Sequence, residues 1–391
     1  MKIIPYGRQS ITKEDVDAVV SALSSDYLTQ GPKVQEFEEK FAQYVGSKYA
    51  VAVSSGTAAL HLSALTLDVN SHSKVITTPI TFSASANCVR YCGGEIVFAD
   101  IDPTTALLDV EKVRTLLEES PRGAFQGVIP VDFAGHPTDL EAFRQLADEY
   151  GLWIIEDACH APGAYFVDSL GKKQSCGNGK YADLAIFSFH PVKHVATGEG
   201  GMITTNDGKL YSRLLRLRTH GITKETSQLT RNDGGWYYEM QELGFNYRMP
   251  DILCALGISQ LGRADAGLAA RHELAKRYDA AFKDNPAIRP LVNFAEIERK
   301  NICHAYHLYV ILTKERLRLY NYLREKKIYA QVHYVPVHQM PYYQKSGFAG
   351  ISYPDAEAYY SECLSIPMYP SLSQQEQNSV ITSINDFTKT L

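Results

Sequence analysis

Lys193 lies in a segment that is unusual for a surface lysine. In SFHPVKHVATGEGGMITTN, residues 188–206, proline and valine precede the lysine and three glycines follow it. Such a composition does not form a solvated helix, so we expect a half-buried amine. Burial disfavours the ammonium form, lowers the pKa and leaves a nucleophile that can attack an aldehyde. Because most lysines are surface residues, this prediction depends on the residues that accompany Lys193.

Two carboxylates, Glu156 and Asp157, end an apolar run in WIIEDACHAPGA, residues 153–164. A carboxylate at the end of a buried strand costs several kcal/mol unless a cation pairs with it. A protonated ring nitrogen of a bound cofactor is such a cation, and the pairing would keep the ring an electron acceptor. A helix N-cap and a metal ligand are the alternatives. His160, three residues later, could face the same ring and contact its phenolic oxygen.

The segment SSGTAALHL, residues 54–62, follows an apolar run and begins an expected helix. The free N–H groups of a helix start, together with the helix dipole, bind phosphate, and hydroxyl groups add donors. Gly56 and Thr57 are the candidates, and Ser188 could donate to the same phosphate. An ordinary N-cap before an alanine-rich helix is the alternative. Neither GxxxxGK[ST] nor a GxGxxG after a strand occurs, so these two nucleotide-binding loops are excluded.

Short apolar runs alternate with helical stretches along the first part of the chain. Strand, crossover helix and strand in succession predict an α/β fold with a mostly parallel sheet and helices on both faces. Ligands of such sheets bind beyond the carboxyl ends of the strands, where the candidates above lie. The expected strands are 49–53, 74–77, 95–99, 127–131 and 153–155, and the expected helices are 11–23, 34–45, 58–65, 83–91, 110–118 and 139–150.

The second part of the chain differs in pattern. A helical stretch runs from about Pro250 to about Phe282, and residues 304–312 and 328–332 have the pattern of strands. With 391 residues the chain exceeds one typical domain. We therefore expect a large unit, residues 1–250, and a smaller C-terminal α/β unit with its connecting helix, residues 251–391.

A metal site is not expected. His304 and His307 are an odd number of positions apart and would point to opposite faces of a strand. No second Cys or His pair has the spacing of a zinc site. Serine hydrolase chemistry is also disfavoured, because no GxSxG turn occurs.

Composition narrows the class of protein. A net charge of -5 and scattered basic residues predict no binding of nucleic acid or of an anionic membrane. No apolar run reaches 18 residues, so we expect no membrane span, and the first residues lack the apolar core of a signal peptide. The seven cysteines are odd in number and form no CxxC pair, which favours reduced thiols in a soluble, cytoplasmic protein.

The chain resembles the DegT/DnrJ/EryC1/StrS family of sugar aminotransferases. The likeness runs from about Ile4 to the C-terminus. It implies an aspartate-aminotransferase-like fold of type I, pyridoxal 5'-phosphate as cofactor (pyridoxamine 5'-phosphate between half-reactions) and a homodimer with a shared active site. The residues that carry it are Gly56, Thr57, Phe82, Asp157, His160, Ser188, Lys193, Gly198 to Gly201 and the segment GFNYRMPD, Gly244 to Asp251.

The resemblance also implies a role for each matching residue. Lys193 would bind the cofactor aldehyde, and a histidine at this position would indicate a dehydratase. Asp157 would lie under the ring nitrogen and Phe82 would stack on the ring. The phosphate would be held by Gly56, Thr57 and Ser188 of one protomer and by Asn246 of its partner. Many members have glutamine where this chain has His160, so the protonation state of His160 would affect the lysine–cofactor linkage.

Within the family, TPITFSASAN, VDFAGHP and SFHPVKH are most similar to 4-aminotransferases of pseudaminic acid biosynthesis. This similarity implies L-glutamate as amino donor and a UDP-2-acetamido-2,6-dideoxy-4-keto-hexose as acceptor. A different UDP-, dTDP- or GDP-keto-sugar, aminated at carbon 3 or carbon 4, and a PLP-fold binding protein without turnover are the alternatives. The candidates for binding the nucleotide-sugar are Tyr6, Tyr27, Thr29, Gln30, Arg248, His333 and Tyr334.

Overall fold

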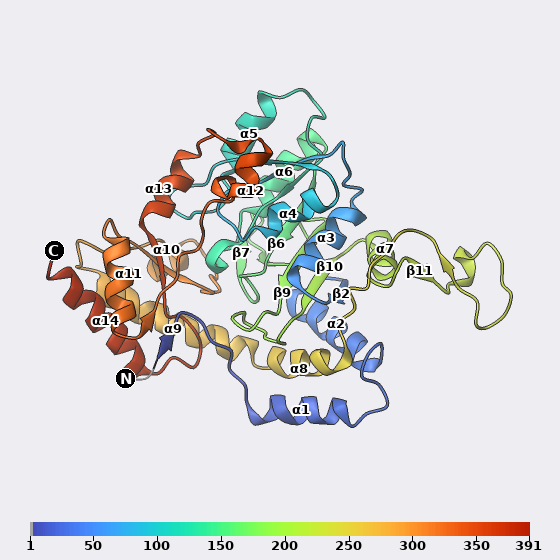
Figure 1. Ribbon diagram of the computed structural model, residues 1–391, viewed down its shortest axis with the longest axis horizontal. Coiled ribbons are helices and arrows are strands. Elements are labelled where there is room, and N and C mark those ends of the chain that lie inside the picture. Colours follow the sequence, from blue (N-terminus) through green and yellow to red (C-terminus); the bar gives the residue numbers. More distant parts are fainter. Residues whose placement is uncertain (1–2) are drawn as a thin grey trace.

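A seven-stranded sheet forms the centre of the computed structural model, which describes residues 3–391 (Figure 1). Strand β10 runs antiparallel to both of its neighbours, and the other neighbouring pairs are parallel. The predicted mostly parallel α/β sheet is therefore confirmed. In spatial order the strands are β2 (Tyr49–Val53), β10 (Gly201–Thr205), β9 (Leu184–Ser188), β6 (Trp153–Asp157), β5 (Gly127–Ile129), β3 (Lys74–Thr77) and β4 (Glu95–Phe98).

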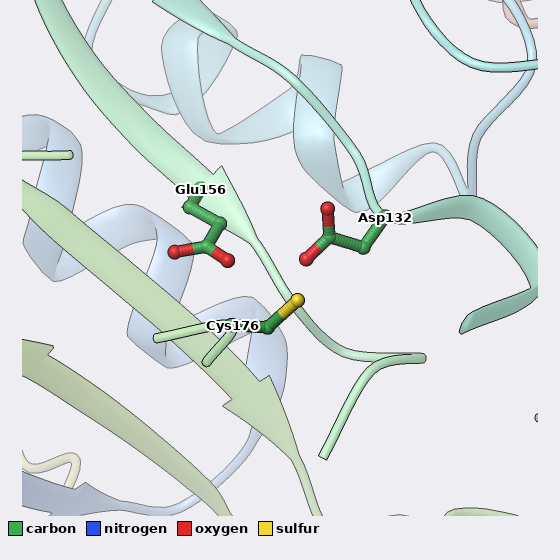
Figure 2. A group of neighbouring side chains, drawn as sticks. All are labelled: Asp132, Glu156 and Cys176. Atoms are coloured by element: carbon green, nitrogen blue, oxygen red, sulfur yellow. The ribbon is translucent and has the colours of Figure 1, made fainter. Parts of the chain in front are cut away.

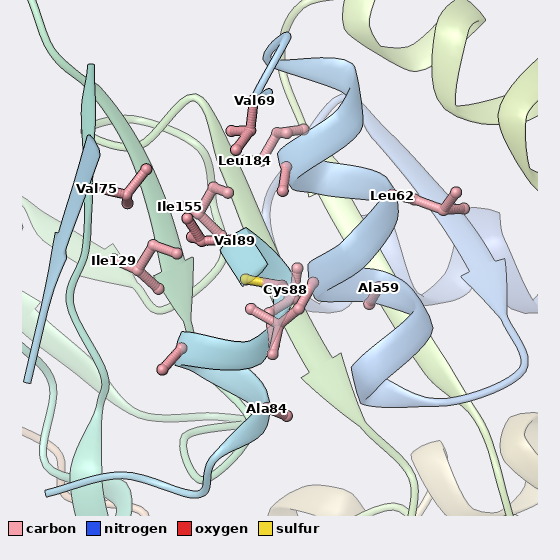
Figure 3. Close-up of a cluster of buried hydrophobic side chains, with 14 of the residues drawn as sticks. Ala59, Leu62, Val69, Val75, Ala84, Cys88, Val89, Ile129, Ile155 and Leu184 are labelled. Carbon is pink, nitrogen blue, oxygen red and sulfur yellow. The ribbon is translucent and has the colours of Figure 1, made fainter. Parts of the chain in front are cut away.

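Helices cover both faces of this sheet, because alternate residues of each strand point to opposite sides. In β2, Val51 and Val53 join the core under α3, α4 and α7, whereas Ala50 and Ala52 join the core under α2 and α8. Figure 3 shows the first of these cores, with buried Cys88 packed as a small hydrophobic residue. The helices are α2 (Pro32–Val45), α3 (Gly56–Thr66), α4 (Ala84–Tyr91), α5 (Val110–Glu118), α6 (Leu140–Tyr150), α7 (Gly208–Arg218) and α8 (Asp251–Leu261).

Helix α1 (Lys13–Leu23) lies within the helix expected at residues 11–23 and has Thr12 as its N-cap. The N–H of Thr12 donates to the carboxylate of Asp15 at 2.9 Å. The same buried carboxylate accepts hydrogen bonds from Ser259 and Gln260 of α8 and pairs with Arg263. One acidic residue thus stabilises the start of α1 and attaches the helix to α8.

Residues of the C-terminal part of the chain form a separate hydrophobic cluster, which Ile4 joins from the N-terminus. Strand β14 (Tyr309–Leu312) pairs antiparallel with β16 (Cys363–Ile366), and the N-terminal β1 (Ile4–Pro5) pairs with β15 (Ile328–Tyr329). The predicted helical stretch from Pro250 is two helices, because the chain turns at Gly262 and Arg263. The other elements of this part of the chain are α9 (Ala264–Phe282), β13 (Arg289–Pro290), α10 (Phe294–Arg299), α11 (Arg316–Glu325) and α14 (Gln374–Thr388).

The strand predicted at residues 304–312 is wrong in its first half. Tyr306 has a positive φ of 47°. Buried Arg271 donates to the carbonyl groups of Tyr306 and His307, so these groups are not available to a strand ladder. The strand predicted at residues 328–332 likewise ends at Tyr329.

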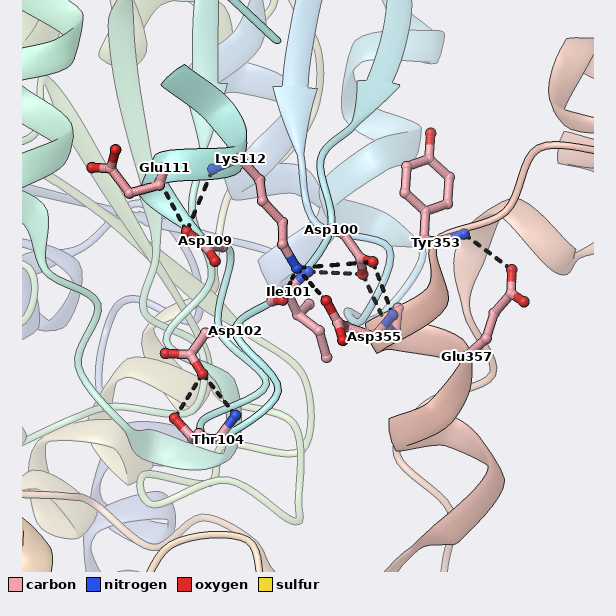
Figure 4. Close-up of polar contacts among 11 residues, drawn as sticks. Asp100, Ile101, Asp102, Thr104, Asp109, Glu111, Lys112, Tyr353, Asp355 and Glu357 are labelled. Carbon is pink, nitrogen blue, oxygen red and sulfur yellow. Dashed lines mark hydrogen bonds and ion pairs between the residues drawn. The ribbon is translucent and has the colours of Figure 1, made fainter. Parts of the chain in front are cut away.

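A segment of the C-terminal half returns to the large sheet. Helix α13 (Pro354–Glu362) begins on the carboxylate of Asp100, which accepts the N–H groups of Asp355 and Ala356, each at 2.9 Å (Figure 4). Lys112 bonds to Asp355 and to the carbonyl oxygen of Ile101. Before α13 the segment contains η3 (Val337–Gln339), α12 (Pro341–Tyr343) and the π-helix η4 (Gln344–Phe348).

An arm extends from the large unit beyond α7 (Figure 1, right). It contains the short hairpin β11 (Ile222–Thr223) and β12 (Glu239–Met240), with η2 (Thr226–Gln228) between them. Large apolar side chains of the arm are exposed, including Trp236 and Leu243. A second small hairpin, β7 (Tyr165–Val167) and β8 (Lys173–Ser175), and the short η1 (Phe133–Gly135) complete the described elements. Among residues 3–391, no helix combines the length and apolarity that a membrane crossing requires.

Candidate active site

A cavity of about 390 Å³ opens at the carboxyl ends of β2, β6 and β9, where the sheet order predicts a ligand. Segments from both halves of the chain line it. The residues singled out from the sequence that the cavity brings together are Tyr6, Gly56, Thr57, Phe82, Asp157, His160, Ser188, Lys193, His333 and Tyr334.

Asp157 is the last residue of β6 and is almost completely buried. The hydroxyl of Ser85 donates to one carboxylate oxygen at 2.7 Å, and the N–H of Cys159 donates to the other at 3.2 Å. These contacts orient the carboxylate and leave acceptor capacity for a group in the cavity. Ser85 was not found from the sequence, because its partner lies 72 residues away and no motif joins them.

Lys193 follows β9 in a turn that its N–H closes on the carbonyl of His190 at 2.8 Å. Burial lowers the pKa of its amine, and the nearby Cys159 and Asp157 oppose that shift. Within the described residues the amine makes no ion pair with a carboxylate. A half-buried amine with no ion-pair partner is suited to act as a nucleophile.

The start of α3 provides the phosphate-binding geometry. Ser55 is the N-cap, and its hydroxyl accepts the N–H of Ala58 at 3.1 Å, while the N–H groups of Gly56 and Thr57 precede the first helical hydrogen bond. A β-carbon at Gly56 would lie 2.9 Å from that of Ser188, so only glycine permits this approach of α3 to β9. The helix start and the Ser188 hydroxyl therefore face one cavity.

His160 is buried between the cavity and the C-terminal unit. Its Nδ1 accepts the N–H of Ala134 at 3.2 Å, and its Nε2 lies 3.3 Å from the hydroxyl of Tyr334. Burial, and then the charge of Lys193, hold the pKa of His160 well below its usual value. The ring is therefore neutral over the physiological pH range.

Phe82 stands at the mouth of the cavity with 60% of its surface exposed. Its ring centroid is 6.2 Å from that of Tyr334. An exposed aromatic ring beside a lysine and a carboxylate can cover one face of a flat ligand.

Five candidates lie outside this cavity. Gln30 and Arg248 line a separate cavity of about 240 Å³, together with Arg218. Tyr27 and Asn246 are exposed, as is Thr29. The backbone of the segment around Arg248 nevertheless pairs with the end of β2, directly before α3. None of these five residues lines the Lys193 cavity of its own chain.

A second group of polar side chains, the acidic cluster of Asp132, Glu156 and Cys176, lies buried behind β6 (Figure 2). Both oxygens of Glu156 accept the N–H of Gly177 at 3.0 Å. Burial raises the pKa of Asp132 to about 6, and burial together with the charge of Asp132 raises the pKa of Glu156 well above its usual value. One carboxylate oxygen of Asp132 has no hydrogen-bond partner among the described residues, and the negative charge of Asp132 favours the protonated form of the neighbouring Glu156. The spacing of the cluster matches no metal motif, so the sequence did not reveal it.

The two histidines expected on opposite faces of a strand lie in an irregular segment instead. His307 packs on the ring of His160, with centroids 4.3 Å apart. His304 accepts the N–H of Tyr306 at 2.8 Å. Burial lowers the pKa of both rings, so they are neutral parts of the wall behind the cavity.

The residues around the cavity fit pyridoxal phosphate. Lys193 offers an amine for its aldehyde and Asp157 a carboxylate for its ring nitrogen, while the start of α3 offers donors for its phosphate. The donors and the charges match the three ends of the cofactor.

Known proteins resemble this chain over almost its whole length. It is 38% identical to the spore coat polysaccharide biosynthesis protein SpsC of Bacillus subtilis (99% of this chain, 97% of the relative). It is 36% identical to the UDP-4-amino-4,6-dideoxy-N-acetyl-beta-L-altrosamine transaminase of Campylobacter jejuni (97% and 96%).

Solved structures agree with these relatives. Helicobacter pylori PseC, an aminotransferase involved in the biosynthesis of pseudoaminic acid, matches with a TM-score of 0.88 at 30% identity over 100% of both chains. The PLP-form of the sugar aminotransferase Spr1654 of Streptococcus pneumoniae matches with a TM-score of 0.88 at 27% identity, over 100% of this chain and 99% of that one. The predicted PLP aminotransferase fold is thus confirmed.

The family model for these enzymes matches residues 9–385. The chain therefore belongs to the DegT/DnrJ/EryC1/StrS aminotransferase family, whose members are sugar aminotransferases that depend on pyridoxal phosphate.

Proposed function

We propose that this enzyme transfers the amino group of L-glutamate to carbon 4 of a UDP-2-acetamido-2,6-dideoxy-4-keto-hexose, with Lys193 as the catalytic residue. The observation that carries the chemistry is the shared cavity of Lys193 and Asp157 beside the start of α3. The observation that supports the substrate is the likeness to the altrosamine transaminase and to PseC.

Pyridoxal phosphate, when bound, supplies an aldehyde that captures the amino group and a ring that accepts electrons. The protein provides the proton transfers. Lys193 would hold the cofactor by its aldehyde, and the free amine of Lys193 would move a proton at the carbon that carries the nitrogen. Burial lowers the pKa of Lys193, which makes its free base more accessible than that of a surface lysine. General acid–base catalysis of this kind contributes about 10² to 10⁴-fold to a rate.

The other cavity residues bind and orient. Asp157, oriented by Ser85, would pair with the ring nitrogen of the cofactor and favour its protonated form. Gly56, Thr57 and Ser188 bind the phosphate at the helix start. Because both half-reactions use one cavity, the enzyme follows ping-pong kinetics.

The acceptor sugar enters past Phe82 and Tyr6. Both residues line the cavity, as do His333 and Tyr334, which we propose as sugar contacts. A second candidate function is amination of a different nucleotide-linked keto-sugar. The 38% identity to SpsC, a protein of spore coat polysaccharide biosynthesis, favours keeping it as an alternative.

A homodimer with a shared active site explains the candidates that lie outside the cavity. Asn246 is exposed and could complete the phosphate site of a partner. Helix α1 presents Val16, Val20 and Leu23 to solvent at helical spacing, and the arm adds Trp236. Exposed apolar stripes of this kind favour burial against a second copy. The seven unpaired cysteines favour the cytoplasm as the compartment.

The test combines a donor assay with an acceptor panel. Glutamate should bleach the visible band of the PLP-loaded enzyme, and mass spectrometry should find a 4-amino sugar when the UDP-linked 4-keto sugar follows. The dTDP- and GDP-linked keto-sugars, and 3-keto isomers, are the comparison substrates. Better conversion of one of these would contradict the proposed acceptor. No bleaching by glutamate, or full turnover by Lys193→Ala, would contradict the mechanism.

A further inference from the structure

The hydrogen-bonding contacts of His160 determine where the hydroxyl hydrogen of Tyr334 points. Tyr334 lines the active-site cavity, and its hydroxyl lies 3.3 Å from Nε2 of His160. Within residues 3–391, His160 is the only group that hydrogen-bonds to this hydroxyl. Either Tyr334 donates to His160 or His160 donates to Tyr334, and only the second case leaves the hydrogen of Tyr334 free for a ligand.

The other nitrogen of His160 decides between the two cases. The N–H of Ala134 donates to Nδ1 at 3.2 Å, so Nδ1 carries no hydrogen. A neutral imidazole has one hydrogen, which must then be on Nε2. In the protonated ring Nδ1 would carry a hydrogen, and this hydrogen would clash with the N–H of Ala134. His160 therefore donates to Tyr334, and the hydrogen of Tyr334 points to another acceptor.

The surroundings keep the ring of His160 neutral and the hydroxyl of Tyr334 protonated. Burial, followed by the charge of Lys193, lowers the pKa of His160, and burial raises the pKa of Tyr334. The hydroxyl thus keeps its hydrogen at neutral pH. The titratable groups that face the two rings are Tyr6, Asp157, Cys159, Lys193, His194, His307 and His333.

We propose that Ala134, His160 and Tyr334 form a hydrogen-bond relay that ends on an oxygen of the bound molecules, with Tyr334 as its final donor. The acceptor is an electron-rich oxygen, either the phenolic oxygen of pyridoxal phosphate or an oxygen of the sugar near the reacting carbon. His160 is then a positioning residue, and Tyr334 takes the direct contact that the family resemblance implies for His160. Hydrogen bonds in a chain polarise one another, which strengthens the last donor.

This inference rests on the proposed function and sharpens it. It places Tyr334 beside the reacting atoms, whereas the sequence suggested only a contact with some part of the nucleotide-sugar. The position of Tyr334 between Phe82 and Phe133, with ring centroids 6.2 and 6.1 Å away, supports a place over the cofactor ring.

Tyr334→Phe tests the proposal, because the substitution removes the hydroxyl and keeps the ring packing. The matched control is Tyr342→Phe, which changes a ring that is 56% exposed and remote from the cavity. The first readout is the visible absorption of the PLP-loaded enzyme, titrated with pH without substrates. If the acceptor is the phenolic oxygen, loss of its donor should move the transition to higher pH by about one unit, equivalent to about tenfold.

The second readout identifies a sugar acceptor. Calorimetry with UDP-N-acetylglucosamine on the PLP-loaded enzyme should show a Kd raised about 2- to 10-fold in Tyr334→Phe, with the absorption titration unchanged. His160→Leu removes the group that donates to Tyr334. Whichever readout Tyr334→Phe changes, His160→Leu should change it in the same direction by a smaller amount. Thermal unfolding checks that each variant folds.

Two results would overturn the relay. One is a Tyr334→Phe enzyme that matches wild type in both readouts. The other is an effect of His160→Leu without any effect of Tyr334→Phe, since His160 would then donate to the ligand directly. Failure of the proposed function is a separate result, because it would appear in the wild-type enzyme, as no bleaching by glutamate or as better conversion of a different keto-sugar.

Discussion

Glu156 and Asp157 are adjacent acids on one strand, yet they lie in different chemical environments. Successive residues of β6 point to opposite faces of the sheet. Asp157 faces the cavity with Lys193 and accepts hydrogen bonds from Ser85 and Cys159. Glu156 faces the acidic cluster, where burial and Asp132 raise its pKa.

This difference shows that burial alone does not make a carboxylate functional. Both side chains are at most 5% exposed. A buried carboxylate is tolerated when it binds a cation, accepts enough hydrogen bonds or takes up a proton. Asp157 keeps capacity for a cation from a ligand, whereas Glu156 takes up a proton. The following predictions test this contrast, from the largest expected effect to the smallest.

Replacing each acid by its amide should affect kcat/KM very differently. Asp157→Asn removes the anion under the cofactor ring, so kcat/KM should fall by about 100-fold or more. Glu156→Gln replaces a protonated acid with a group of the same shape, so kcat/KM should stay within about threefold of wild type. Steady-state transamination of glutamate measures both. Equal losses of kcat/KM in the two variants would contradict the proposed difference between Asp157 and Glu156.

Ser85→Ala tests the support of Asp157. The variant leaves a buried carboxylate without its hydroxyl donor at 2.7 Å, a contact of the charge-assisted kind. Losing such a bond costs about 1.5–3 kcal/mol, so the Kd for pyridoxal phosphate should rise at least about tenfold. Equilibrium titration of the apoenzyme measures it. Ser83→Ala on the same segment is the control, and an unchanged affinity in Ser85→Ala would show that Asp157 needs no support.

The acidic cluster should make folding stability depend on pH. Burial raises the pKa of Asp132 to about 6 in the folded chain, above the unfolded value of 3.8, and raises that of Glu156 above 4.5. Above these unfolded values the unfolded chain releases protons that the folded chain keeps. The free energy of unfolding should therefore fall as pH rises from about 4 to above 6.

Urea unfolding of wild type and Glu156→Gln between pH 4 and pH 8 measures this contribution. The variant cannot release a proton at position 156, so its stability should fall less steeply over the same window. Identical slopes would mean that Glu156 is not protonated in the folded enzyme.

Asp100→Asn should have the smallest effect. The Asp100 carboxylate accepts the N–H groups of Asp355 and Ala356 at the start of α13, and an amide can accept with only one of its two groups. Loss of a helix cap costs about 1 kcal/mol, which urea unfolding would detect. Asp102→Asn is the control, because it changes a half-buried acid of the neighbouring loop whose side chain accepts hydrogen bonds from Thr104. An equal loss in the control would show that the α13 cap is not the cause.

The sequence predicted the large sheet well because its signals are local. The apolar runs at β2 and β3 match the observed strands, and the capping pair Thr12 and Asp15 marks the start of α1. β9 and β10 were not predicted as strands, since glycines and polar residues lie close to both ends.

The candidate site was predicted in part. Lys193, Asp157 and the start of α3 belong to continuous motifs that end at one edge of the sheet. Ser85 and the relay through His160 depend on contacts between distant segments, and no spacing in the sequence reveals them. The irregular backbone at residues 304–308 also depends on a distant segment, because Arg271 of α9 donates hydrogen bonds to the carbonyl groups of Tyr306 and His307.

The central claim is that Lys193 binds pyridoxal phosphate in the cavity it shares with Asp157. Borohydride reduction of the PLP-loaded enzyme, followed by peptide mass spectrometry, tests it directly. The account predicts a single phosphopyridoxyl group on Lys193, absent when the enzyme is first treated with glutamate. A label on a different lysine, or none, would contradict it.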